Sequence, residues 1–175
     1  MSAVLLALVA ALASALLTWL AIAWAHAARM HDEPGARRMH VEPTVRGAGI
    51  GFVAVIVSGW GAWGIALGWA VPLGRWAIGA SLALVLVALV SWIDDRRGLP
   101  VLPRLVTHIV AASLLAFASW PTLAAELPWP LALCLPLLAV PAINFWNFID
   151  GINGMAASQA MLVAAALAVL ALMAG

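Results

Sequence analysis

Residues 76–97 read WAIGASLALVLVALVSWIDDRR, and they are the clearest indication of the fold class. The first eighteen of them, 76–93, carry no charge, and the run then ends abruptly in four charged residues at 94–97. A charge-free apolar run of this length is typical of a helix that crosses a bilayer. We therefore expect a transmembrane helix that ends at a charged membrane boundary.

The rest of the chain has the same pattern. Of its 175 residues, 66% are hydrophobic and only 9% are charged, whereas soluble domains carry about 25% charged residues. This composition excludes a water-soluble fold, and the net charge of +1 excludes a basic nucleic-acid-binding surface. We predict an all-α polytopic membrane helix bundle in a single domain, 1–175. Six transmembrane helices are expected, at 3–27, 48–69, 76–93, 105–121, 131–147 and 154–174.

The charges predict the orientation of this bundle. Six crossings place both termini on one side, and the connecting segments then put seven of the eight arginines on the other side. The positive-inside rule makes that face cytoplasmic. Six of the seven acidic residues fall there too. We expect a multi-pass protein of the bacterial inner (cytoplasmic) membrane, with a periplasmic N-terminus and an active face toward the cytoplasm.

Three segments on this face carry chemistry, and the first is the pair Asp94-Asp95. Adjacent carboxylates at a membrane boundary are costly and tend to be functional, and they repel each other unless a cation lies between them. The plainer interpretation is a solvated helix end in which these aspartates pair with Arg96 and Arg97. Taken alone, the pair is a weak signal.

The second segment is NFWNFIDGING, residues 144–154. A spacing of three places Asn144, Asn147 and Asp150 on one helical stripe, and glycines follow that let a backbone approach a ligand. Amides can bond a base or ribose, and a carboxylate can hold Mg²⁺ that meets phosphates. The alternative is a polar cap between two helices.

The third segment is the loop 31–49. Its arginines suit an anionic ligand, because a guanidinium grips phosphate with two hydrogen bonds. A loop that merely anchors the protein by the positive-inside rule explains the arginines equally well, but does not explain the turn Pro43-Thr44-Val45-Arg46-Gly47. The candidate ligand-binding residues of this loop are Arg37, His40, Thr44 and Arg46.

Prolines interrupt the fifth apolar run. Pro136 and Pro141 each remove a helix hydrogen bond, so we expect a kinked or broken helix there. The alternative is that neighbouring helices compensate for the lost bonds. His26 and His108 lie in apolar runs and are expected to form interhelical hydrogen bonds.

Together, in this order and on one face, the three segments resemble the polyprenyl-phosphate sugar-1-phosphate transferases, membrane glycosyltransferase family 4. That family includes phospho-N-acetylmuramoyl-pentapeptide transferase and undecaprenyl-phosphate N-acetylglucosaminyl-1-phosphate transferase. Its motifs look like the loop from Asp32 to Gly47, the pair Asp94-Asp95, and Asn147-x-x-Asp150-Gly151-x-x-Gly154.

The resemblance implies transfer of a sugar 1-phosphate from a UDP-N-acetylhexosamine, N-acetylglucosamine by default, to undecaprenyl or another polyprenyl phosphate. UMP is released, and the product starts a surface polysaccharide such as O-antigen or another envelope glycan. It implies Mg²⁺, with Mn²⁺ as a substitute. Asp94 and Asp95 are the implied catalytic residues, assigned jointly, and they share the metal with Asp150. The implied substrate-binding residues are Arg37, His40, Thr44, Arg46, Asn144, Asn147, Asp150 and Asn153.

Two departures from the family pattern stand out. Members usually carry Asp where this chain has Asn153. They also have ten or eleven spans, with a further metal-binding aspartate and a histidine-rich loop in later segments. We expect this chain to be the N-terminal half of such a domain. A truncated relative that is inactive alone, or a homo-oligomer in which two chains combine, are the alternatives.

Two other classes of protein fit the sequence less well. CDP-alcohol phosphotransferases have a signature that begins Asp-Gly-x-x-Ala-Arg, and Asp150-Gly151 is not followed by Ala-Arg. A small membrane scaffold or half of a transporter would line a cavity at mid-membrane, whereas the polar residues gather at the interface. The sequence therefore favours the transferase.

Overall fold

The computed structural model describes residues 3–32, 44–45, 47–149 and 155–174. Helices dominate these residues, as the apolar runs predict, so the all-α class is confirmed. The six helices are α1 (Ala3–Ala27), α2 (Ile50–Leu67), α3 (Pro72–Arg97), α4 (Val101–Glu126), α5 (Trp129–Ile149) and α6 (Met155–Ala174). Two two-residue strands, β1 (His31–Asp32) and β2 (Thr44–Val45), pair antiparallel between α1 and α2.

Four of these helices are long and apolar enough to cross a membrane, namely α1, α2, α3 and α4. Their mean hydropathies lie between 1.8 and 2.4. Within α6 the described apolar stretch, Ser158–Leu170, is shorter than a span. The protein is therefore an all-α membrane helix bundle, and the expectation of six crossings goes beyond the four spans found among the described residues.

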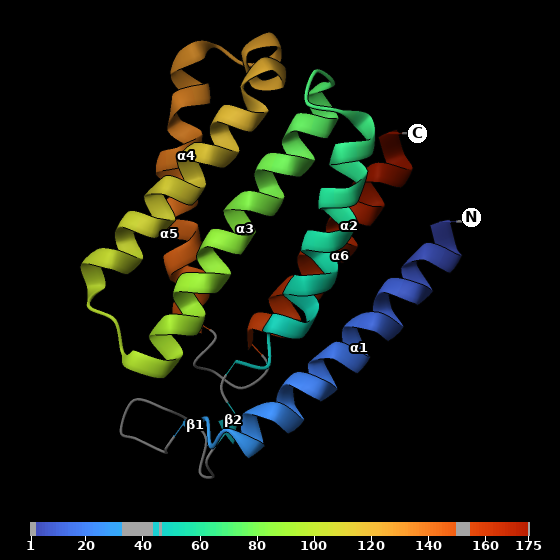
Figure 1. The fold of residues 1–175 in the computed structure, drawn as a ribbon. Coiled ribbons are helices and arrows are strands. Elements are labelled where there is room, and N and C mark those ends of the chain that lie inside the picture. The colour runs from blue at the N-terminus through green and yellow to red at the C-terminus, as the bar shows by residue number, and fades with distance from the viewer. Residues whose placement is uncertain (1–2, 33–43, 46, 150–154, 175) are drawn as a thin grey trace.

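The helices run alternately up and down (Figure 1). At one end of the bundle α1, α3 and α5 finish and α2, α4 and α6 begin, and β1 and β2 lie beside them. We call this the polar end, because it carries the charged residues Arg29, Asp32, Asp94, Asp95, Arg96, Arg97 and Arg104. The start of α1 and the end of α6 lie at the opposite end (Figure 1). This arrangement agrees with the predicted clustering of charge at one surface.

Small residues hold the centre of the bundle together. Helix α3 packs against α2 on one side and α4 on the other, and the residues that it buries are small: Gly74, Ala77, Gly79, Ala80, Ser81 and Ala83. In a membrane, helices associate through close packing of small side chains, since lipid tails are as apolar as leucine. Large apolar side chains accordingly lie on the outside of all six helices.

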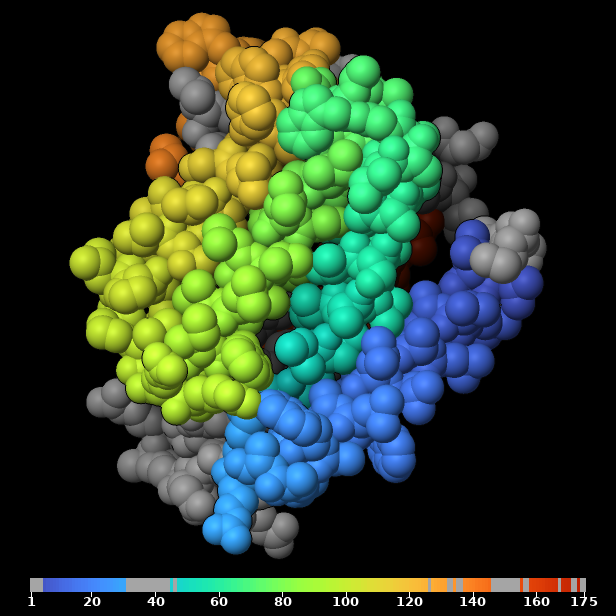
Figure 2. Space-filling model, in the orientation of Figure 1, coloured from blue at the N-terminus to red at the C-terminus, as the bar shows by residue number. Residues whose placement is uncertain are grey.

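Helix α1 packs against α2 less closely than α3 does. A Cβ added to Gly51 of α2 would overlap the backbone of Leu17 and Thr18, so the two helices touch where they cross. Beyond that crossing α1 diverges from α2 (Figure 2). The hollow between them, about 550 Å³, is lined by Leu6, Ala7, Ala10, Gly59, Trp60 and Trp63. It is apolar and contains none of the predicted site residues.

Two expectations about the helices need correction. Helix α5 continues without a break through Pro136 and Pro141, so the break is absent there, and a helix in a bundle tolerates a missing hydrogen bond when its surroundings compensate. A kink without a break stays a prediction. Helix α3 is longer than the predicted 76–93 at both ends. It begins with Pro72, which fits the first helical turn, and continues through the charged residues as far as Arg97.

Candidate functional site at the polar end of the bundle

The aspartate pair lies in the last turn of α3. A helix of 26 residues is about 39 Å long, whereas the hydrocarbon core is about 30 Å thick, so the charged turn extends past the apolar layer. The helix ends at Gly98, whose φ of 61° is left-handed and whose N–H donates to the Asp94 carbonyl at 2.8 Å. Glycine adopts this conformation without strain. The pair is thus held on a capped, regular helix end.

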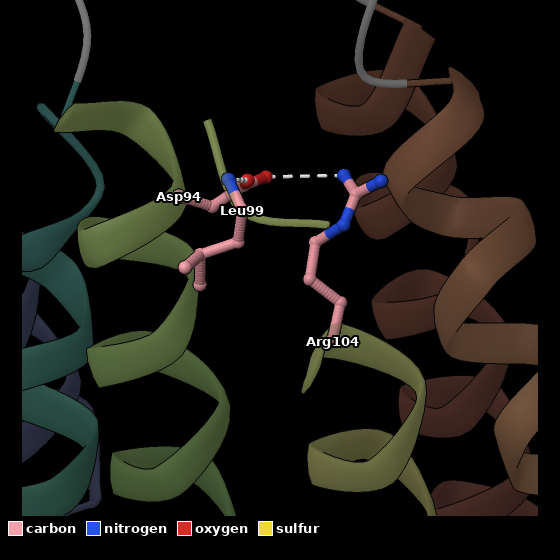
Figure 3. A network of polar contacts seen from close by, with 3 residues as sticks. All are labelled: Asp94, Leu99 and Arg104. Carbon is pink, nitrogen blue, oxygen red and sulfur yellow. Dashed lines mark hydrogen bonds and ion pairs between the residues drawn. The ribbon is translucent and has the colours of Figure 1, made fainter. Parts of the chain in front are cut away.

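Asp94 is held by two donors from the next segment of chain (Figure 3). The Leu99 N–H donates to Oδ1 at 2.6 Å, and Nη1 of Arg104 donates to Oδ2 at 3.0 Å. The plainer interpretation of the sequence expected the aspartates to pair with their immediate neighbours, Arg96 and Arg97. For Asp94 the ion pair is instead with Arg104 of α4.

Arg96 lies over two tryptophan rings. Its guanidinium carbon is 4.0 Å from the centroid of Trp92 in the same helix and 5.2 Å from that of Trp24 in α1. Cation–π contacts of this kind are favourable by about 0.5–2 kcal/mol. Arg96 therefore joins the end of α1 to the end of α3.

The loop segment is described only in part. The ladder of β1 and β2 sets His31 opposite Val45 and Asp32 opposite Thr44. It brings the backbone of Thr44 to the end of α1, at the polar end. The other predicted binding residues of this loop, Arg37, His40 and Arg46, lie outside the described residues.

The third segment begins on α5. Asn144 is exposed, and its Nδ2 donates to the Val140 carbonyl one turn earlier at 2.9 Å. Asn147 lies in the same helix, in a part where the structure describes the backbone alone. Asp150 and Asn153 lie outside the described residues. Since α5 packs against α4 and α4 packs against α3, the described part of this segment is one helix away from the aspartate pair.

The described residues include no group of three or more His, Cys, Asp or Glu side chains that could hold a metal ion. Asp94 and Asp95 are both present at the polar end, but both Asp94 oxygens already accept hydrogen bonds from protein donors. The third predicted ligand, Asp150, lies beyond the described residues. What these residues offer is a carboxylate-bearing helix end among several guanidinium groups, which suits a charged phosphate substrate.

Sequence reasoning missed the specific roles of Arg104 and Arg96. A signal for Arg104 was present: Gly98-Leu99-Pro100 is a turn sequence, and a short turn brings the start of one helix beside the end of the last. No comparable signal links Arg96 to Trp24, because that contact depends on how α1 crosses the bundle. His108 is buried, and its Nδ1 has no hydrogen-bond partner among the described residues.

Comparisons with known proteins support the family that the sequence resembles. The family model of glycosyl transferase family 4 matches residues 77–175, a range that includes the aspartate pair and the segment 144–154. Decaprenyl-phosphate N-acetylglucosaminephosphotransferase of Mycolicibacterium smegmatis is 29% identical over 177 residues. That alignment covers 90% of this chain but 43% of the relative, so the chain spans less than half the length of that curated protein. No solved structure matches the chain. On the evidence of its apolar helices, its charged polar end and the family match over more than half of its length, the chain belongs to glycosyl transferase family 4.

Proposed function

We propose that the protein to which this chain belongs transfers a sugar 1-phosphate from a UDP-sugar to a polyprenyl phosphate and releases UMP. The donor is a UDP-N-acetylhexosamine, by default UDP-N-acetylglucosamine, and the acceptor is undecaprenyl phosphate. The product begins a surface polysaccharide or another envelope glycan. The family match and the name of the M. smegmatis relative, which acts on decaprenyl phosphate, support a polyprenyl phosphate acceptor and the transfer of an N-acetylglucosamine phosphate group.

The observation that carries the proposal is the position of Asp94 and Asp95 in the last turn of α3. This helix is apolar enough to span a membrane, so its charged end lies where a lipid phosphate and a soluble nucleotide can meet. A protein that only needed membrane anchors would have no use for adjacent carboxylates there. The site is therefore proposed at the polar end of the bundle.

The proposed step is a displacement at phosphorus. An oxygen of the polyprenyl phosphate attacks the phosphorus that bears the sugar, and the bond from that phosphorus to the bridging oxygen breaks. The electron pair leaves with UMP, and the new diphosphate links the lipid to the sugar. Phosphoryl transfer depends on positioning and on charge stabilisation, which arginines and a carboxylate-held metal supply. A covalent aspartyl intermediate is the alternative route, in which an aspartate attacks first.

A divalent cation, Mg²⁺ or in its place Mn²⁺, is part of this proposal. When bound, it would neutralise the charge that develops on the leaving UMP. Asp94, Asp95 and Asp150 are the residues proposed jointly as its ligands. The remaining binding roles are proposed for Arg37, His40, Thr44, Arg46, Asn144, Asn147 and Asn153.

The site is proposed to lie on the cytoplasmic face of the bacterial inner membrane. Arginines support this orientation, because among the described residues the polar end carries Arg29, Arg96, Arg97 and Arg104 while the opposite end carries Arg75. The positive-inside rule then places the start of α1 in the periplasm.

The test uses the full-length protein in membranes with undecaprenyl phosphate, Mg²⁺ and a UDP-sugar, and measures UMP. We expect UMP release from UDP-N-acetylglucosamine or UDP-N-acetylgalactosamine, and a loss of about a thousandfold or more in Asp95→Asn, as for removal of a catalytic group. Glu126→Gln is the matched control, since it makes the same change at the opposite end of the bundle. Undiminished release in both Asp95→Asn and Asp150→Asn would show that the site is assigned wrongly.

A further inference from the structure

Arg75 lies in the first turn of α3, at the end of the bundle opposite the polar end (Figure 1). The charge-free residues 76–93 follow it. As a helix they are about 27 Å long, close to the thickness of the hydrocarbon core, about 30 Å. Arg75 and Asp94 therefore mark the two boundaries of the apolar layer. Trp69 is 45% exposed just before this helix, as is typical of a tryptophan at a membrane interface.

The positive charge of Arg75 is not neutralised by the protein. Arg75 forms no ion pair with any residue that the structure describes, and its buried Nε has no hydrogen-bond acceptor among them. Charges at such a boundary are costly unless they are paired. The start of α3 adds to the positive potential, because no side chain caps it and the first N–H groups of a helix carry the positive end of its dipole. This end of α3 therefore suits an anion.

An apolar groove of about 210 Å³ begins one turn from Arg75, between α2 and α3. Ile78 and Leu82 line it from α3, and they share a face of the helix with Arg75, because they follow it by three and seven residues. Gly61 and Ile65 line it from α2. Ile65 and Leu82 are 74% and 52% exposed, so the groove opens to the outside of the bundle.

The lining of the groove suits hydrocarbon and not water. Ser81 has the polar side chain of the lining, and its Oγ already donates to the Ala77 carbonyl at 2.8 Å. An ordered water needs two or more polar partners, which these walls do not offer. Gly61 leaves the space open, since a Cβ added there meets Ser81 Oγ at 3.8 Å and nothing else within 4 Å.

The length of the groove matches one leaflet of the membrane. Val85 is the lining residue farthest along α3 from Arg75. It is ten residues away, or about 15 Å of helix, which is half the hydrocarbon thickness of about 30 Å. Asp94 is nineteen residues, or about 28 Å of helix, from Arg75. An anion at Arg75 is therefore not the phosphate that reacts at the polar end.

We propose that Arg75, the start of α3 and the groove between α2 and α3 bind one glycerophospholipid, with its phosphate on the guanidinium and one acyl chain in the groove. A guanidinium matches a phosphate with two parallel hydrogen bonds. Phosphatidylglycerol is favoured over phosphatidylcholine, because the positive charge of choline would lie close to Arg75. This lipid site is separate from the proposed reaction and does not depend on it.

Native mass spectrometry of the full-length protein in detergent tests the lipid site. Phosphatidylglycerol or phosphatidylcholine with the same acyl chains is added, and the bound lipid is measured. We expect one phosphatidylglycerol per chain to bind about five- to tenfold more tightly than phosphatidylcholine. Arg75→Gln should remove this preference, because one charge-assisted contact is lost. Arg97→Gln is the matched control, an exposed arginine at the other end of the same helix, and should change the affinity less than about twofold.

A second pair of variants tests the groove. Gly61→Leu fills the groove from α2 and should weaken the binding of both phospholipids to a similar extent. Gly59→Leu is the matched control, because a Cβ there meets nothing within 4 Å and this residue lines the hollow beside α1 instead. It should leave lipid binding unchanged. Equal binding by the two leucine variants would show that the acyl chain does not lie in the groove.

Three other results would overturn the proposal. Equal affinities of the wild type for the two phospholipids would mean that Arg75 selects no headgroup. Equal losses in Arg75→Gln and Arg97→Gln would show a general attraction of anionic lipid. Displacement of phosphatidylglycerol by undecaprenyl phosphate, as effective as by phosphatidylglycerol itself, would make this a site for the acceptor lipid. Glycerol 3-phosphate should displace nothing, since it has no acyl chain for the groove.

Discussion

Gly79 of α3 lies directly against Ala118 of α4, so closely that a Cβ added to the glycine would overlap the Cβ of the alanine. Ala118 is 1% exposed. The ion pair of Asp94 and Arg104 joins the same two helices near their other ends. Helices α3 and α4 are therefore fixed at two points, one made by close packing and the other by charge.

The close contact between Gly79 and Ala118 predicts that Gly79→Ala lowers the stability of the folded protein. The added methyl group has no room unless the helices separate, and overpacking of this kind costs about 1–3 kcal/mol. Thermal unfolding of the full-length protein in detergent would measure it. Gly59→Ala is the matched control, because a Cβ there meets nothing within 4 Å. It should be neutral or slightly stabilising, and equal midpoints for the two variants would contradict the prediction.

The contact between Arg96 and Trp24 predicts energetic coupling between α1 and α3. A double-mutant cycle of Arg96→Gln and Trp24→Leu should give a coupling of about 0.5–1 kcal/mol in unfolding stability. The control cycle replaces Arg96→Gln with Arg97→Gln, and should give no coupling beyond the error. Additivity in both cycles would mean that the stacking contributes nothing to the attachment of α1.

The proposed orientation predicts the behaviour of reporter fusions. A reporter enzyme that is active only in the periplasm should be silent when fused after Arg38 and active when fused after Leu127, which follows α4 at the opposite end of the bundle. The positive-inside rule is the physical basis. Activity after Arg38 would reverse the orientation.

The proposed metal predicts that UMP release stops when the full-length protein is treated with EDTA. Excess Mg²⁺ or Mn²⁺ should restore it, because the cation is needed to offset charge on the leaving group. A matched sample that receives EDTA already saturated with Mg²⁺ controls for effects of the chelator on the membrane. Full release in the presence of free EDTA would exclude a dissociable metal.

The sequence predicts the helices well because their signal is strong and local. Each charge-free run corresponds to a helix, and α1 has the predicted limits of 3–27. The predicted end of α3, at residue 93, falls four residues before the observed end at Arg97, and the reason is clear. Absence of charge marks the apolar layer, but a helix continues beyond that layer until its backbone hydrogen bonding is capped, which here happens at Gly98.

The position of the aspartate pair at a helix end was predictable, but its contacts were not. The pair Asp94-Asp95 lies at a helix end as expected, whereas its partner Arg104 is ten positions away and depends on the turn between the helices. The arginine loop and the end of the segment 144–154 lie mostly outside the described residues, so their predicted roles stay predictions. The prolines of α5 do not break the helix, since local propensity can yield to the packing of neighbouring helices.

The three-residue link between α3 and α4 also limits how this part of the protein can move. Sliding one helix past the other by a single turn would take about 5.4 Å, and so short a link has no slack to supply it without unwinding a helix end. The two helices must therefore tilt or rotate together, as one rigid body. Any closure of the site around a substrate would carry Asp95 along with α4, or would leave both in place while the other segments close over them.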